Sequence, residues 1–137
     1  MRAVIDTNVL FEGLTKQGSV CALIVEAWDN GLLQACVSNT LVHEYFDVLA
    51  RKLAPARWQQ IQPRLESLLA RAESVHIYYT WRPSSPDPGD EHVIDCAMNA
   101  VVPVVTLNLR DFRAAQQSLG LAVMTPVEMI FALANQP

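Results

Sequence analysis

The sequence predicts a three-layer α/β fold, with helices on both faces of a central, mostly parallel, twisted sheet of about five strands. Short β-branched segments alternate with segments of helical periodicity, a pattern typical of right-handed βαβ crossovers. Hydrophobic residues make up 51% of the 137 residues, with only 5 Gly and 8 Pro. This composition excludes a disordered, collagen-like or charge-rich coiled-coil chain. We expect a single domain spanning residues 1–137 with a core of its own.

The strands are predicted where short runs are rich in β-branched residues. Five segments meet this criterion: Ala3–Ile5, Gln34–Val37, Val75–Tyr79, Val102–Thr106 and Ala122–Met124. Apolar side chains at helical spacing predict helices within residues 20–28, 41–49 and 58–72. Asn30-Gly31 is a typical C-terminal cap for the first of these helices, and Ser38 or Asn39 is the expected N-cap of the second.

Proline and capping residues predict two later helices. Thr125-Pro126-Val127-Glu128 predicts a capping box with proline at the first helical position, so Glu128 is better explained as a cap than as a catalyst. Asp87 followed by Pro88 has the same N-terminal signature, and we interpret Asp87 as an N-cap.

Asp90 is expected to point inward from the helix that follows Pro88. At about 100° per residue, four apolar residues share its face: Val93, Ile94, Ala97 and Val101. Four polar residues lie on the opposite arc: Glu91, His92, Asp95 and Asn99. Asp95, like Asp47, is therefore interpreted as a surface acid. A carboxylate on an apolar face must be neutralised, hydrogen-bonded or bound to a cation, and the free N–H groups of its own first turn are the structural alternative.

The charge and cysteine content exclude several classes of protein. A net charge of −4 argues against coating nucleic acid by bulk charge. Six of the ten basic residues lie between positions 51 and 82, whereas residues 83–95 hold four acids and no base, so the pattern indicates either a basic patch facing an acidic pocket or a solvated face. Three cysteines without CxxC spacing favour a reducing compartment over a disulfide framework or structural zinc.

The sequence predicts neither a secretory signal nor a membrane span. Its first residues reach Asp6 after three apolar residues, which does not fit a secretory signal, and there is no run of 18 apolar residues for a membrane span. We therefore expect a cytoplasmic protein with no membrane association.

Polar residues follow two of the predicted strands. Asp6-Thr7-Asn8 follows the first strand, and the fourth ends at Thr106, shortly before Asn108 and Asp111. Ligands of open parallel sheets bind beyond the carboxyl ends of the strands. Asp6 taken alone could simply cap the next helix. Glu44, at the edge of its apolar stripe, could form a surface ion pair on the face shared with Arg51.

Four acids, with Asn108 beside them, could instead converge on one pocket: Asp6, Glu44, Asp90 and Asp111. Four carboxylates in one place repel one another unless a cation holds them, and all-oxygen ligation favours Mg²⁺ or Mn²⁺ over zinc. Such a centre suits phosphodiester hydrolysis. No glycine-rich phosphate loop or Ser/His/Asp arrangement is present, and we interpret His43, His76 and His92 as structural or exposed.

Four segments in this order along nearly the whole chain resemble the PIN domain, a metal-dependent ribonuclease fold. They are Val4-Ile5-Asp6-Thr7-Asn8-Val9-Leu10, Ser38-Asn39-Thr40-Leu41-Val42-His43-Glu44, Asp87-Pro88-Gly89-Asp90 and Val105-Thr106-Leu107-Asn108-Leu109-Arg110-Asp111-Phe112. The chain is similar in particular to the VapC-like PIN toxins of bacterial toxin–antitoxin pairs, which are single domains of this size. Two features depart from the family pattern. Asn108 stands where many relatives have Asp, and the Asn99–Val102 link lacks the glycine often found there.

The resemblance implies a site and its partners. Asp6, Glu44, Asp90 and Asp111 would form the acidic quartet, with Mg²⁺ or Mn²⁺ as cofactor and RNA as substrate. A homodimer and a cognate antitoxin protein are the implied partners. Asp6 and Asp90 are expected to hold the principal metal, with Glu44 and Asp111 completing its ligands directly or through water.

Further residues are expected around the quartet. Four polar residues would hold the acids in place: Thr7, Asn8, Thr106 and Asn108. Arg51, Lys52 and Arg57 would grip the RNA backbone. Two other hypotheses remain open. One is a non-catalytic PIN scaffold that binds RNA or protein. The other, disfavoured, is a haloacid-dehalogenase-like phosphatase, which needs a second Asp where this chain has Asn8.

Overall fold

The computed structural model describes residues 1–136; the expected domain extends to Pro137, which lies outside the described residues. The strands are β1 (Arg2–Ile5), β2 (Gln34–Val37), β3 (Glu73–Ser74), β4 (Val104–Val105) and β5 (Val123–Met124). The helices are α1 (Thr7–Thr15), α2 (Val20–Asp29), α3 (Asn39–Lys52), α4 (Pro55–Ala70), α5 (Glu91–Ala100), α6 (Arg113–Leu119) and α7 (Pro126–Ala134). Two 3₁₀ turns, η1 (Pro88–Asp90) and η2 (Leu109–Phe112), precede α5 and α6.

The five strands form one parallel sheet in the order β3-β2-β1-β4-β5. From β1 the chain builds the sheet outward through β2 and β3, and then crosses to the other side of β1 for β4 and β5. The strand order therefore reverses between β1 and β4. In an open parallel sheet this reversal opens a crevice beyond the carboxyl ends of the strands, so the topology places a site after Ile5 and Val105.

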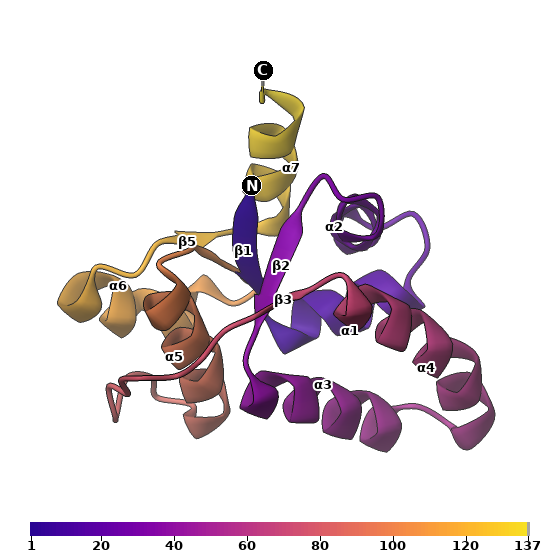
Figure 1. The fold of residues 1–137 in the computed structure, drawn as a ribbon, viewed down its shortest axis with the longest axis horizontal. Helices are drawn as coiled ribbons and strands as arrows, with labels where there is room; N and C mark the ends of the chain where they lie inside the picture. The colour runs from indigo at the N-terminus through magenta and orange to yellow at the C-terminus, as the bar shows by residue number, and fades with distance from the viewer. Residues whose placement is uncertain (137) are drawn as a thin grey trace.

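Helices cover both faces of the sheet, which confirms the predicted three-layer α/β fold. In Figure 1, α5 and α6 lie on one side of the strands, and α1, α2 and α4 lie on the other. Ala3, Val4 and Ile5 of β1 are fully buried, as expected of a parallel strand that is covered on both faces. α1 and α2 pack so closely that a Cβ on Gly13 would lie 2.4 Å from Cγ2 of Val25.

The predicted helix ends are confirmed. Ser38 caps α3, Asn30 ends α2 and is followed by Gly31 at φ 79°, and Thr125 forms the capping box with Glu128. Val101, the residue that follows the last residue of α5, adopts φ 57°. This left-handed conformation favours glycine, so the missing glycine leaves a strained residue at this turn.

The third strand was predicted in the wrong place. β3 spans Glu73–Ser74 instead of Val75–Tyr79, and its last ladder bond runs from the Val75 N–H to the Val37 oxygen (2.8 Å). β2 ends at Val37 and the chain then enters α3, so no partner strand remains for the residues after Val75. No helix in residues 1–136 is both long enough and apolar enough to span a membrane.

Candidate metal centre

Asp6 lies at the reversal of strand order, directly after β1, and is only 5% exposed. Its Oδ2 accepts a hydrogen bond from the Thr106 hydroxyl (2.7 Å), which follows the neighbouring strand β4. Its Oδ1 accepts from the Thr7 N–H (2.8 Å), so Asp6 also caps α1. Asp6 can therefore cap α1 and still belong to the acidic site, because both of its hydrogen bonds leave the carboxylate at the crevice.

Three further segments bring acids to this crevice. Glu44 comes from α3 and accepts a hydrogen bond from the Thr7 hydroxyl (2.9 Å). Asp87 caps the start of η1, Asp90 is its last residue, and Asp111 comes from η2. Carboxylate oxygens of Asp87, Asp90 and Asp111 all lie within 4.8 Å of one another. Four of these acids line a cavity of about 130 Å³: Asp6, Glu44, Asp87 and Asp90.

Asp87 has a second role that the sequence interpretation missed. Its side chain does accept from the Gly89 N–H (3.0 Å), as predicted for an N-cap. The same carboxylate also belongs to the cluster with Asp90 and Asp111. The spacing of Asp87 and Asp90 could have indicated this role. The two residues lie one 3₁₀ turn apart, and side chains three residues apart share one side of such a turn.

The polar residues expected around the acids lie at different distances from them. Asn108 donates to Asp111 Oδ2 through its side-chain amide (2.7 Å), and its backbone N–H donates to the Thr106 hydroxyl (3.0 Å). Thr7 contacts both Asp6 and Glu44. Asn8 is exposed and lines the cavity without a described hydrogen bond to an acid. These contacts fix the orientation of Asp6, Glu44 and Asp111.

The expected basic residues separate into two groups. Arg51 and Lys52, at the end of α3, line the cavity beside the acids. Arg57 lies elsewhere: its guanidinium donates to the Thr15 oxygen (3.1 Å) and lines a different cavity, between α1 and α4. The turn between α3 and α4 carries Arg57 away from the acids, so the structure does not bring the three expected bases together.

The crevice disfavours negative charge. Burial, reinforced by the charges of Glu44 and Asp111, raises the pKa of Asp6 to about 6, although bonds from Thr106 and Thr7 oppose the shift. Burial, together with the neighbouring carboxylates of Asp6, Asp87 and Asp111, raises the pKa of Asp90 to about 8. Burial also raises the pKa of Glu44. Ionising all of these acids together therefore requires a compensating positive charge.

The donor set fits a hard divalent cation. Among the described residues, no Lys, Arg or His side chain forms an ion pair with any of the five acids. Their hydrogen-bond donors are hydroxyl, amide and backbone groups. A site with oxygen ligands alone suits Mg²⁺ or Mn²⁺ better than zinc.

A family model described as PIN domain matches residues 2–110, which include most of the crevice. The chain belongs to the PIN domain family. This assignment replaces the phosphatase hypothesis. No match to a curated protein was found.

Solved structures share the fold of this PIN domain. The structure of VapBC2 from Rickettsia felis, bound to a DNA fragment from their promoter, matches with a TM-score of 0.65 at 14% identity, over 91% of this chain and 98% of the other. FitAcB from Neisseria gonorrhoeae matches with 0.65 at 21% identity, over 93% and 99%. FitAB bound to an IR36 DNA fragment matches with 0.63 at 20% identity, over 92% and 95%.

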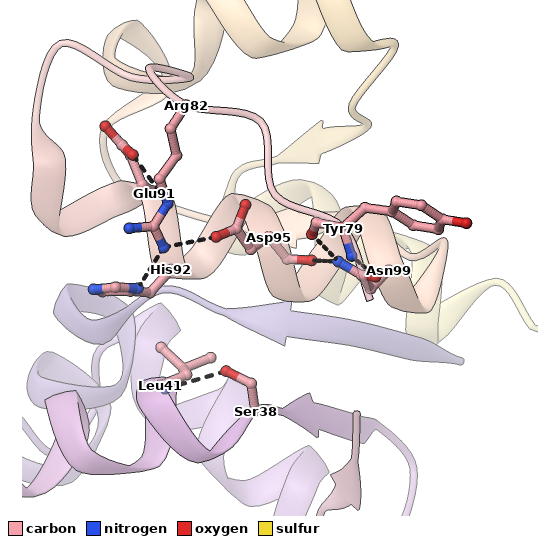
Figure 2. A network of polar contacts seen from close by, with 8 residues as sticks. All are labelled: Ser38, Leu41, Tyr79, Arg82, Glu91, His92, Asp95 and Asn99. Carbon is pink, nitrogen blue, oxygen red and sulfur yellow. Dashed lines mark hydrogen bonds and ion pairs between the residues drawn. The ribbon is translucent and has the colours of Figure 1, made fainter. Parts of the chain in front are cut away.

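Asp95 of the PIN domain is not the surface acid that the helical wheel predicted. It is 2% exposed, because the segment that follows β3 crosses the polar arc of α5. Arg82 of that segment donates to Asp95 Oδ2 (2.9 Å), lies 3.3 Å from Glu91 and contacts His92 Nδ1 (3.2 Å). Figure 2 shows Arg82 reaching these three side chains of α5. The arc is polar because it binds a covering segment, not because it faces solvent.

Replacing Arg82 is expected to destabilise the protein. Arg82→Gln leaves the buried Asp95 carboxylate without its cationic partner, while Asp95 Oδ1 already lacks a hydrogen bond in the described residues. We expect the free energy of unfolding in urea to fall by about 1–2 kcal/mol, since Arg82 itself is half exposed. Arg113→Gln, at an exposed position of α6, is the matched control and should change it by less than about 0.5 kcal/mol. An Arg82→Gln protein as stable as the control would contradict the role of this ion pair.

Proposed function

We propose that this PIN domain is a Mg²⁺- or Mn²⁺-dependent endoribonuclease that hydrolyses RNA phosphodiester bonds. The observation that carries the proposal is the convergence of acids from β1, α3, η1 and η2, distant in sequence, on one crevice at the strand-order reversal. Membership of the PIN family supports the same activity. Asp6, Glu44, Asp90 and Asp111 would hold the cation, and the position of Asp87 adds a fifth candidate ligand.

Each part of the crevice has a distinct task in this proposal. A bound divalent cation supplies activation of water and neutralisation of charge developing on the phosphate. Thr106 and Thr7 hold the Asp6 carboxylate in one orientation, and Thr7 sets Glu44 relative to it. Asn108 holds Asp111. Arg51 and Lys52 lie at the edge of the same cavity, where their charges would bind the RNA phosphates on one side of the scissile bond.

We further propose that the protein is the toxin of a toxin–antitoxin pair, silenced by a cognate antitoxin and active as a homodimer. The similarity of its fold to VapBC2 and FitAcB supports the pairing with an antitoxin. The three cysteines are free and buried, which fits a reducing compartment such as the cytoplasm, where RNA is the accessible substrate.

A metal titration with a cleavage assay tests the enzymatic proposal. Mn²⁺ at about a hundred times its Kd should stabilise the protein by about 2.7 kcal/mol, which raises the Tm by about 10 °C. A labelled single-stranded RNA should be cleaved in Mn²⁺ or Mg²⁺ and left intact in EDTA. If Mn²⁺ neither raises the Tm nor supports cleavage, the protein is a non-catalytic PIN scaffold instead.

A further inference from the structure

A second cavity lies beside the metal centre, under the segment that covers α5. We call this segment, residues 76–82, the strap. The cavity measures about 190 Å³. Its walls come from the start of α3, from the strap and from α5: Ser38, Thr40, Ile77, Thr80, His92 and Asp95. Figure 2 shows Ser38 at the start of α3, opposite His92 and Asp95.

The two cavities lie in series along one face of α3. Thr40 lines the second cavity, while Glu44, Val48 and Lys52 line the metal centre. These four residues are spaced by four, so they follow one another on the same face over about 18 Å. On α5, Asp95 and His92 line the second cavity, and Asp90, just before the helix, lines the first. A chain bound across the metal centre would thus have Arg51 and Lys52 at one end and the second cavity at the other.

The second cavity is polar but has little net charge. Its Arg82 is paired with Asp95 at 2.9 Å and Glu91 at 3.3 Å, so the guanidinium charge is already balanced. The hydroxyls of Thr40 and Thr80 have no hydrogen-bond partner among the described residues. Such walls offer hydrogen bonds to an uncharged polar group and little attraction to a phosphate. At the other end of the α3 face, Arg51 lies 3.8 Å from Asp47, whereas Lys52 forms no ion pair among the described residues and keeps a charge available for a phosphate.

The walls of the cavity offer both hydrogen-bonding groups and a planar ring. His92 lines one wall, where its Nδ1 lies 3.2 Å from Arg82. The hydroxyls of Thr40 and Thr80 line other walls and can both donate and accept. Such groups match the edge of a heterocyclic base.

The size and surroundings of the cavity limit which chemical groups it can bind. Sites for drug-sized ligands and cofactors occupy about 300–1,000 Å³, so 190 Å³ suits one small planar group. Outside the cavity the strap exposes Tyr78 (78%) and Tyr79 (70%). Both backbone N–H groups bond to Asn99 Oδ1 (3.0 and 3.2 Å), which holds the strap on α5. In Figure 2 the Tyr79 ring points away from the Arg82 network. Exposed aromatic rings are the usual stacking surface for single-stranded nucleic acid.

We propose that the cavity between the strap, α3 and α5 binds one unpaired nucleobase of the RNA, adjacent to the phosphate held at the metal centre. This inference rests on the proposed function, because it takes the same RNA as its ligand. Arg51 and Lys52 hold the backbone on one side of the scissile bond, and the cavity holds a base on the other. Discrimination among RNAs then depends on the strap as well as on the charge of the crevice.

Filling the cavity tests the proposal. Thr80→Phe places an aromatic ring in the space that the base would occupy, at an exposed position with no described hydrogen bond to lose. We expect it to weaken binding of a fluorescein-labelled, mixed-sequence single-stranded RNA by about tenfold. Binding is measured by fluorescence anisotropy in Mn²⁺, in an Asp6→Asn background that prevents cleavage. Binding of an equally long ribose-phosphate oligomer without bases should not change.

Control variants separate the cavity from general effects. Gln116→Phe adds an aromatic ring on exposed α6, outside the cavity, and should leave binding unchanged. Thr40→Phe fills the cavity from its opposite wall and should reproduce the loss, and circular dichroism confirms that each variant is folded. If both filled variants bind RNA as tightly as Gln116→Phe, or lose affinity equally for the base-free oligomer, the proposal is overturned.

The same proteins distinguish the two proposals. RNA cleavage in Mn²⁺ by the protein with its native Asp6 tests the nuclease, whereas the anisotropy measurement tests the base cavity. Absence of cleavage with a selective loss of RNA binding in Thr80→Phe would overturn the nuclease and support the cavity. Cleavage of RNA, together with unchanged RNA binding in Thr80→Phe, would support the nuclease and overturn the base cavity.

Discussion

Asp6→Asn and Asp90→Asn are each expected to reduce Mn²⁺-dependent RNA cleavage by more than about 100-fold, the upper range for residues that only support metal ligands. The Asp6→Asn substitution keeps the size of the side chain and an oxygen that accepts from the Thr7 N–H. It removes the negative charge at the point where β1 and β4 open the crevice. The loss therefore reports on the charge of the proposed metal ligand and not on the fold.

The measurement is the initial rate of cleavage of a labelled RNA, with Mn²⁺ varied to separate weaker metal binding from slower hydrolysis. Glu66→Gln, which removes a carboxylate from the exposed face of α4, is the matched control and should change the rate by less than about twofold. Undiminished cleavage by both Asp6→Asn and Asp90→Asn would show that the acids in the crevice do not carry the activity.

The position of the candidate site was predictable because it depends on topology. Parallel strands bring their carboxyl ends to one edge, so the polar residues after Ile5 and Val105 had to meet if those strands were neighbours. The structure places them beside each other, with Thr106 bonded to Asp6. Sequence periodicity alone did not predict α1 or α6, since α1 begins within the polar residues of the crevice and α6 is only 7 residues long.

The covering strap was not predictable from local patterns. Alternation in residues 75–79 is the same for a strand that pairs in a sheet and for an extended segment held by a side chain. Here the Tyr78 and Tyr79 amides bond to Asn99 instead of to a neighbouring strand. Asp95 was misplaced for the same reason, because a helical wheel shows which residues share a face but not what covers that face. The ion pair between the buried Asp95 and the half-exposed Arg82 joins residues 13 positions apart in sequence.

Raising the pH is expected to destabilise the metal-free protein and to enlarge its stabilisation by Mn²⁺. Burial, together with neighbouring carboxylates, raises the pKa of Asp6 to about 6 and that of Asp90 to about 8, whereas an unfolded Asp titrates at 3.8. Between about pH 4 and pH 8 the folded protein therefore binds more protons than the unfolded chain. The free energy of unfolding falls as pH rises across this window, because the sign follows the excess of protons in the folded state.

The proposed cation should act in the opposite direction. A divalent cation needs ionised carboxylate ligands, so protons would compete with it below pH 8 and its affinity would rise as they leave. The Tm measured in EDTA and in Mn²⁺ at about pH 5.5 and about pH 8 should therefore diverge toward the higher pH. In Asp90→Asn the decline in EDTA should be shallower, because the most strongly shifted acid is gone. A metal-free Tm that rises between these two pH values, with a constant increment from Mn²⁺, would mean that the acids of the crevice are ionised without a cation to hold them.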